Sequence, residues 1–90
     1  MEVLLRGDLP TFQLHGVSLT RANYPVQRRG DFECSDPVLN EVWRLGRATL
    51  HACMEDAYLD CPMRERGLYS GDFFVQFFSN LAAFGDTRLF

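Results

Sequence analysis

Two long stripes of apolar residues in the second half of the chain predict two helices. In the first, apolar positions recur at steps of three and four, the period of an amphipathic helix; they are Leu39, Val42, Trp43, Gly46, Leu50, Cys53 and Met54. The run Ser35-Asp36-Pro37 comes just before it, and a capping side chain followed by proline is a usual helix start. We expect this helix to begin near Asp36, to run for about five turns and to fade near Tyr58, ahead of Cys61-Pro62. Glycine costs a helix about 1 kcal/mol relative to alanine, so Gly46 predicts close packing there.

The second stripe predicts a helix that is apolar around most of its circumference. Ser70 is placed to cap its start, and Asp72 falls in the first turn, where a negative charge suits the helix dipole. Five phenylalanines follow between residues 73 and 84, and Gly85 suits a C-terminal cap. Residues 86–88 resemble the opening of a third helix. A helix with so much apolar surface is expected to be buried in a larger body.

The first third of the chain predicts strands. Residues 11–15 alternate in polarity, and residues 17–21 alternate again after Gly16, which is the period of half-buried strands. Two short strands, or one strand with a bulge at Gly16, are equally allowed. Tyr24-Pro25 ends the pattern, and residues 27–31 suit an exposed turn.

Length and charge narrow the possible functions. Ninety residues make one small domain or part of a larger one. The formal charge of −3, with nine basic residues that are all arginine, argues against a nucleic-acid partner. No apolar run is long enough to span a membrane, and the first residues do not form a secretory signal. A cytoplasmic location is therefore expected.

The cysteines predict neither a disulfide framework nor a metal site. Cys34, Cys53 and Cys61 are few, odd in number and widely spaced, so reduced thiols are expected. With His15 and His51 they could in principle bind zinc, but no C-x-x-C or H-x-x-x-H pair is present. We expect no metal and no cofactor.

The loop between the predicted helices, DCPMRERGLYSGD at 60–72, concentrates ionisable residues. It contains Asp60, Arg64, Glu65, Arg66 and Asp72, next to Tyr69, with Glu55 and Asp56 just upstream. A polar site is often built on such a loop between packed helices. If the carboxylates converge, Glu65 could hold a proton near neutral pH and act as a general acid. Solvated charges or structural ion pairs would give the same spacing.

This loop also carries a family resemblance. Together with CMED at 53–56 and FGDTR at 84–88, the order of motifs over about residues 17–90 resembles the bacterial α-L-rhamnosidases of glycoside hydrolase family 78. The resemblance implies a mixed, mainly α fold. Residues 1–33 would be terminal strands of a β-sandwich or a linker, and residues 34–90 the first helical hairpin of an incomplete (α/α)6 barrel.

The resemblance also implies an activity and roles for individual residues. Family members release terminal α-L-rhamnose with inversion and without a catalytic metal. By position, Glu65 matches the general acid, and Asp60 and Asp72 match acids that hold the sugar hydroxyls. Arg64 matches the motif, and Tyr69 stands where the family usually has tryptophan, so both are assigned to substrate binding.

The general base of such an enzyme lies far beyond these residues in the family. The resemblance therefore implies two partners, a rhamnose-containing glycoside and the remainder of the parent polypeptide, and predicts that ninety residues alone are inactive. The alternative hypothesis is a non-catalytic, truncated helical module that acts in self-association or carbohydrate contact.

Overall fold

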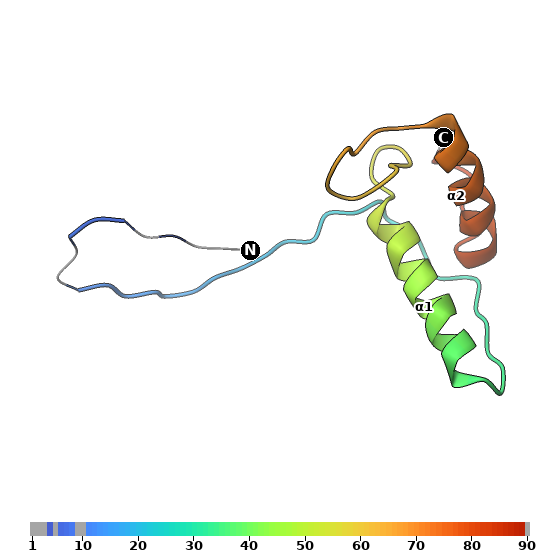
Figure 1. Cartoon of the computed structure of the whole chain (residues 1–90), viewed down its shortest axis with the longest axis horizontal. Helices are drawn as coiled ribbons and strands as arrows, with labels where there is room; N and C mark the ends of the chain where they lie inside the picture. The colour runs from blue at the N-terminus through green and yellow to red at the C-terminus, as the bar shows by residue number, and fades with distance from the viewer. Residues whose placement is uncertain (1–3, 5, 9–10, 90) are drawn as a thin grey trace.

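The protein is a helical hairpin with an extended N-terminal arm. A computed structural model describes residues 4, 6–8 and 11–89. These residues contain two helices, α1 (Pro37–Ala52) and α2 (Ser70–Ala83), and no strand. The helices run in opposite directions and are joined by the loop of residues 53–69 (Figure 1). The mainly α hairpin is as predicted.

Helix α1 begins where the sequence indicates. The Asp36 carboxylate accepts a hydrogen bond from the Val38 N–H at 2.8 Å, and Pro37 is the first helical residue. Asn40 clamps the chain in front of the helix, since its side chain accepts from the Cys34 N–H at 2.9 Å and donates to the Cys34 carbonyl at 2.8 Å. The Asp36 side chain thus pairs one of the backbone N–H groups that the first turn of a helix leaves without a partner.

Helix α1 ends earlier than the apolar pattern predicts. Its last residue is Ala52, after which the chain folds back so that the Leu59 N–H donates to the Cys53 carbonyl at 2.8 Å. Met54 and Tyr58 lie opposite each other in this reversal and are almost completely buried. The apolar spacing continues past Ala52 because the residues that follow are buried in this turn. They are not part of the helix.

The expectation of close packing at Gly46 is wrong. Apart from the chain neighbours of Gly46 and the backbone of its own helix, no described heavy atom lies within 4 Å of the place where its side-chain carbon would stand. The close approach is at Gly30 instead, where such a carbon would lie 1.7 Å from the Ala82 carbonyl oxygen. The Gly30 N–H donates to the Ala83 carbonyl at 3.0 Å, so residues before α1 pass directly over the end of α2.

The start of helix α2 differs from the sequence prediction, whereas its end agrees with it. Ser70 does not cap it, because Ser70 is already helical and the extended residue before it is Tyr69. At the other end, Gly85 has a φ of +62° and its N–H donates to the Asn80 carbonyl at 2.9 Å, as expected for a C-terminal cap. Residues 86–89 are not helical, so the predicted third helix is absent from the described chain.

The core lies where the loop, the ends of both helices and the C-terminal segment meet. Its buried apolar members are Leu50, Met54, Tyr58, Ala83, Phe84 and Leu89. Asn80 is also fully buried, and its side-chain amide donates to the Tyr58 hydroxyl and to the Asp86 carbonyl. These two hydrogen bonds connect the loop to the C-terminal segment. They also pair the amide N–H groups, which would be costly to leave without partners in a buried position.

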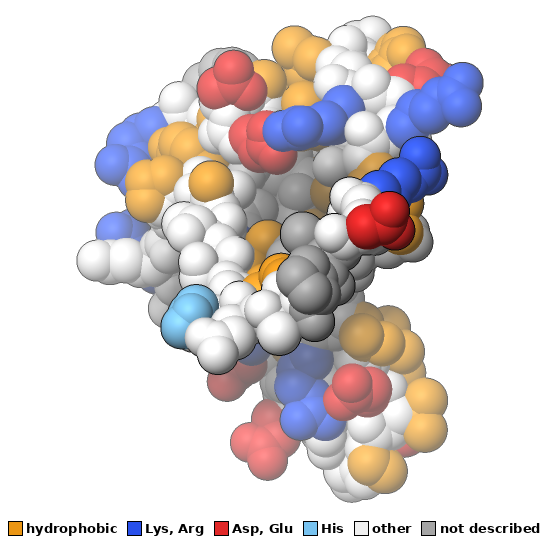
Figure 2. All heavy atoms as spheres, turned by 90° about the vertical axis from the view of Figure 1, so that its left-hand side faces the viewer, with side chains coloured by type: hydrophobic (Ala, Val, Ile, Leu, Met, Phe, Trp, Pro, Cys, Tyr) orange, Lys and Arg blue, Asp and Glu red, His pale blue; other side chains and the backbone are white. Residues whose placement is uncertain are grey.

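Much of the apolar surface of both helices is uncovered in the described chain. Phe74 is 64% exposed and Phe78 56% on α2, and Val42 is 58% exposed on α1. Figure 2 shows apolar side chains exposed between charged ones over the upper part of one face, and again at its lower end. An exposed apolar area of this kind is typical of a surface that another element covers.

The strands predicted for residues 11–21 are not formed. All of these residues are exposed, and the arm extends away from the helices (Figure 1). The radius of gyration is 18.4 Å, against about 12 Å for a compact chain of this length. A strand needs a neighbouring backbone for its hydrogen bonds, and no described residue supplies one here.

The chain joins the hairpin after the arm. The Asn23 side chain donates to the His51 carbonyl at 3.0 Å, and the Tyr24 N–H donates to the Met54 carbonyl at 2.9 Å. His51 returns a contact from its Nε2 to the Tyr24 carbonyl at 2.9 Å. Residues 23–30 therefore follow α1 from its end toward its start (Figure 1).

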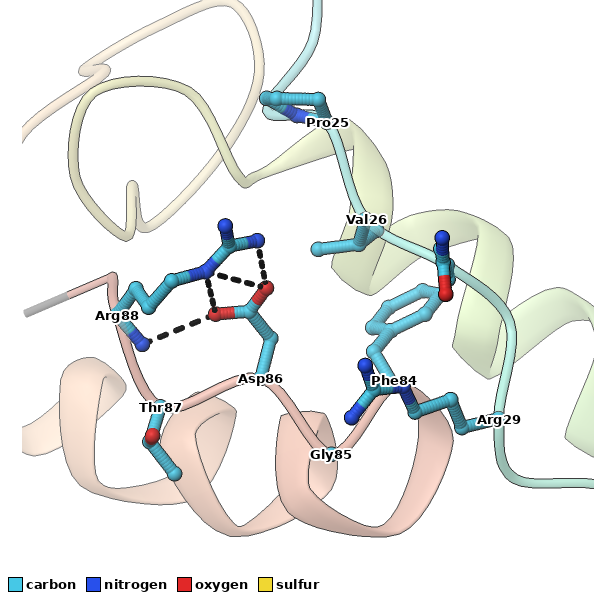
Figure 3. Close-up of a pocket in the computed structure, with 9 residues that line it drawn as sticks. Pro25, Val26, Arg29, Phe84, Gly85, Asp86, Thr87 and Arg88 are labelled. Carbon is cyan, nitrogen blue, oxygen red and sulfur yellow. Dashed lines mark hydrogen bonds and ion pairs between the residues drawn. The ribbon is translucent and has the colours of Figure 1, made fainter.

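An ion pair organises the segment after α2. Asp86 and Arg88 pair through both carboxylate oxygens at the edge of a hollow of about 660 Å³ that Val26 and Phe84 also line (Figure 3). The Asp86 carboxylate also accepts from the Arg88 N–H at 2.9 Å. Its side chain is 9% exposed.

Acid is expected to weaken this segment. The hydrogen bonds from Arg88 lower the pKa of Asp86 from 3.8 to about 2. A carboxylate with a lowered pKa stabilises the fold above its ordinary pKa, and this contribution is lost as the pH falls through the lowered value. Unfolding measured between about pH 4 and about pH 2 should show this loss, and Asp86→Asn should abolish it. Identical pH dependence in the variant would contradict the expectation.

Candidate functional site

The loop that carries the candidate residues is closed by a pair of hydrogen bonds. The Asp60 N–H donates to the Gly67 carbonyl at 2.9 Å, and the Gly67 N–H donates to Asp60 Oδ1 at 2.8 Å. The Gly67 N–H is the main reason why the pKa of Asp60 lies below its ordinary value, and N–H groups of Cys61 and Glu65 act in the same direction. Asp60 therefore holds the loop in shape with one carboxylate oxygen.

Glu65 lies on the exposed side of this loop. The side chain is exposed, because no other described element covers the tip of the loop. One of its oxygens, Oε2, accepts a hydrogen bond from the Tyr69 hydroxyl. The carboxyl group is thus oriented by a fixed partner while still accessible to a ligand.

Tyr69 connects the candidate acid Glu65 to the start of helix α2. Its pKa is raised, first by the hydrogen bond to Glu65, then by burial and by the charges of Asp60 and Asp72. Of the three candidate carboxylates, Glu65 is in direct contact with the phenol, while Asp60 and Asp72 act on it through their charge. The convergence of all three acids stays a prediction.

The two arginines of the motif behave differently. Arg66, at a φ of +61°, forms an ion pair with Glu55 and so attaches the loop to the chain just after α1. Arg64 is exposed and makes no hydrogen bond or ion pair with any described residue. Arg66 therefore belongs to a structural ion pair, whereas Arg64 is available to contact a ligand.

A hollow of about 640 Å³ runs between the two helices and reaches the loop at Asp60. Trp43 and Phe78 contribute apolar walls, and Gln76 contributes a polar one. The Gln76 side chain donates to the Leu59 carbonyl at 2.8 Å and so fixes the residue next to Asp60. Gln76 and Asn80 were not predicted from the sequence. The feature that could have indicated them is an amide side chain within an otherwise apolar helix.

The other ionisable groups do not assemble into a second centre in the described residues. Cys34, Cys53 and Cys61 are free thiols, and burial raises the pKa of Cys53. No group of three or more potential metal-binding side chains comes together within residues 4, 6–8 and 11–89. In the same residues, neither helix has the length and apolar character needed to cross a lipid bilayer.

Comparison with known proteins places this hairpin in a class, the six-hairpin glycosidases. Residues 27–90, more than half of the chain, match the family model of the bacterial α-L-rhamnosidase six-hairpin glycosidase domain. The chain therefore belongs to this family, as its motifs indicated. No curated protein and no solved structure matches it. The match starts at residue 27, whereas the motifs suggested a start near residue 17. The matched part thus includes Gly30, whose N–H donates to the Ala83 carbonyl at the end of α2.

Proposed function

We propose that this chain supplies the general-acid hairpin of an inverting glycosidase that releases terminal α-L-rhamnose. Membership of the rhamnosidase family supports a glycoside substrate. The observation that carries the proposal is the hydrogen bond from the Tyr69 hydroxyl to Glu65, in a loop whose other acids, Asp60 and Asp72, raise the pKa of the same phenol through their charge. Glycoside hydrolysis by a pair of carboxyl groups requires one of them to protonate the departing oxygen.

The roles follow from what each side chain still has available. Glu65 uses Oε2 for Tyr69 and keeps Oε1 for a ligand. Asp60 uses Oδ1 for Gly67 and lies at the end of the hollow between the helices, while Asp72 is exposed in the first turn of α2. Carboxylates are strong acceptors for the hydroxyl groups of a sugar. Glu65 is therefore assigned as the acid, and Asp60 and Asp72 as residues that orient the sugar.

Inversion also needs a general base, a second carboxylate about 6.5–9.5 Å from the acid. The proposal assigns it to another hairpin of the same domain. Residues 34–90 would then be the first hairpin of an (α/α)6 barrel, and residues 1–33 the end of a preceding β-sandwich or a linker. The exposed apolar side chains of α1 and α2 support this arrangement, since neighbouring hairpins would cover them.

The stereochemistry of the product tests this proposal. The chain joined to the remaining hairpins of a family member should hydrolyse an α-L-rhamnoside, with β-L-rhamnose as the first anomer seen by proton NMR. The 90-residue chain alone should show no turnover. If α-L-rhamnose forms first, the inverting mechanism is wrong.

The second candidate function is a non-catalytic module that associates with itself. The exposure of Phe74 and Phe78 favours it, because copies could pair through these faces. It predicts a dimer or larger species on a sizing column and no turnover when the chain is joined to the other hairpins. Turnover in that fusion would eliminate it as the main function.

A further inference from the structure

Tyr69 is fixed at its backbone, its ring and its hydroxyl. It directly precedes helix α2, and its carbonyl accepts a hydrogen bond from the Phe73 N–H at 2.8 Å. Its ring lies so close to Gly67 that a side-chain carbon there would come within 2.9 Å of it. Its hydroxyl donates to Glu65 Oε2. The phenol is therefore held at one place on a rigid helix end.

We propose that Tyr69 is a positioning residue for Glu65. The Tyr69 hydroxyl donates to Oε2 of Glu65, so that the catalytic proton of Glu65 is carried on Oε1. The inference rests on the proposed function, in which Glu65 is the general acid. A protonated carboxyl group has one carbonyl oxygen, which accepts, and one hydroxyl oxygen, which donates. Because the phenol donates to Oε2, that oxygen is favoured as the carbonyl, and the proton is directed to Oε1, the oxygen that Tyr69 leaves available.

The same contact stabilises Glu65 after the proton has left. In the reaction, the proton moves from Oε1 to the glycosidic oxygen, and the bond between that oxygen and the anomeric carbon breaks with its electron pair kept by the oxygen. Water attacks the anomeric carbon and gives its proton to the base. Negative charge develops on Glu65 meanwhile, and a hydrogen bond to an ionised acceptor is stronger than one to a neutral acceptor. The phenol thus acts most strongly in the transition state.

The surroundings keep Tyr69 in its donor form. The hydrogen bond to Glu65 comes first among the causes that raise the pKa of Tyr69, followed by burial and by the negative charges of Asp60 and Asp72. A phenol with a raised pKa stays protonated throughout the neutral range. Phenylalanine at this position would keep the ring against Gly67 and lose only the hydroxyl.

The contact itself can be tested in the 90-residue chain without any activity. Tyrosine labelled with ¹³C at Cζ reports the titration of each phenol by NMR. Glu65→Gln should lower the titration midpoint of Tyr69, because the charged acceptor is removed. Glu33→Gln, which changes an exposed carboxylate with no hydrogen bond or ion pair in the described chain, should leave that midpoint unchanged. An unchanged midpoint in Glu65→Gln would overturn the inference.

The catalytic consequence is tested in the chain joined to the remaining hairpins. Tyr69→Phe should lower kcat for an alkyl α-L-rhamnoside about tenfold, with little change in KM, because the lost hydrogen bond acts on the transition state. The alkaline side of the pH–rate profile should also move to higher pH. If Glu65→Gln is impaired and Tyr69→Phe is not, the inference fails and the proposed function stands. If Glu65→Gln keeps full activity, the proposed function itself fails.

Discussion

Glu65→Gln is expected to lower kcat/KM for an alkyl α-L-rhamnoside by about 100- to 10,000-fold, the usual contribution of general acid catalysis. The measurement is made on the chain joined to the remaining hairpins of the domain. The amide has nearly the same shape as the carboxyl group and still accepts from the Tyr69 hydroxyl, but it has no proton to give. The loss should therefore appear in turnover rather than in the fold.

The control for this substitution is Glu33→Gln. Glu33 is exposed before α1, outside the loop that carries Glu65, so the same loss of one negative charge should leave kcat/KM unchanged. Circular dichroism should show equal helix content in both variants. Equal activity of the two variants would mean that Glu65 donates no proton.

Gly30→Ala is expected to destabilise the hairpin by about 1–3 kcal/mol or more. The added carbon would stand 1.7 Å from the Ala82 carbonyl oxygen and 2.8 Å from its carbon. Both are backbone atoms of α2, so no flexible side chain can move aside. Residues 27–30 would have to leave the helix, with loss of the hydrogen bond from the Gly30 N–H to the Ala83 carbonyl. Urea unfolding followed by circular dichroism measures the change.

Gly46→Ala is the matched control for that experiment. Gly46 is inside α1, and outside the backbone of that helix no described atom lies within 4 Å of the added carbon. Alanine there should stabilise the helix by about 1 kcal/mol. The same chemical change should therefore shift the unfolding midpoint in opposite directions at the two positions. A stabilising Gly30→Ala would show that residues 27–30 do not pack on α2 as described.

The sequence predicted those features of the fold that depend on neighbouring residues. The start of α1 at Asp36-Pro37 and the glycine cap of α2 at Gly85 are local in this sense, and both are confirmed. The strands of residues 11–21 and the packing of a glycine against a helix depend on distant parts of the chain. Periodicity gives the face of an element but not its partner. The packing expectation at Gly46 was therefore wrong, and the strands are not formed in the described residues.

The candidate site was predicted to a similar extent. The spacing of acids in residues 60–72 allowed them to converge but did not show whether they do. The hydrogen bonds that shape this loop, from Gly67 to Asp60 and from Tyr69 to Glu65, depend on the turn at Arg66 with its positive φ. A non-glycine residue in that conformation is uncommon and has no sequence indication here.

The most direct test of Glu65 as the proton donor is the dependence of rate on the leaving group. A series of aryl and alkyl α-L-rhamnosides, hydrolysed by the joined domain, should give a kcat/KM that changes little with the acidity of the departing alcohol. In Glu65→Gln, kcat/KM should fall steeply as the departing alcohol becomes less acidic, because its oxygen must then leave without a proton. Parallel lines for the two proteins, with equal losses on good and poor leaving groups, would contradict the acid role.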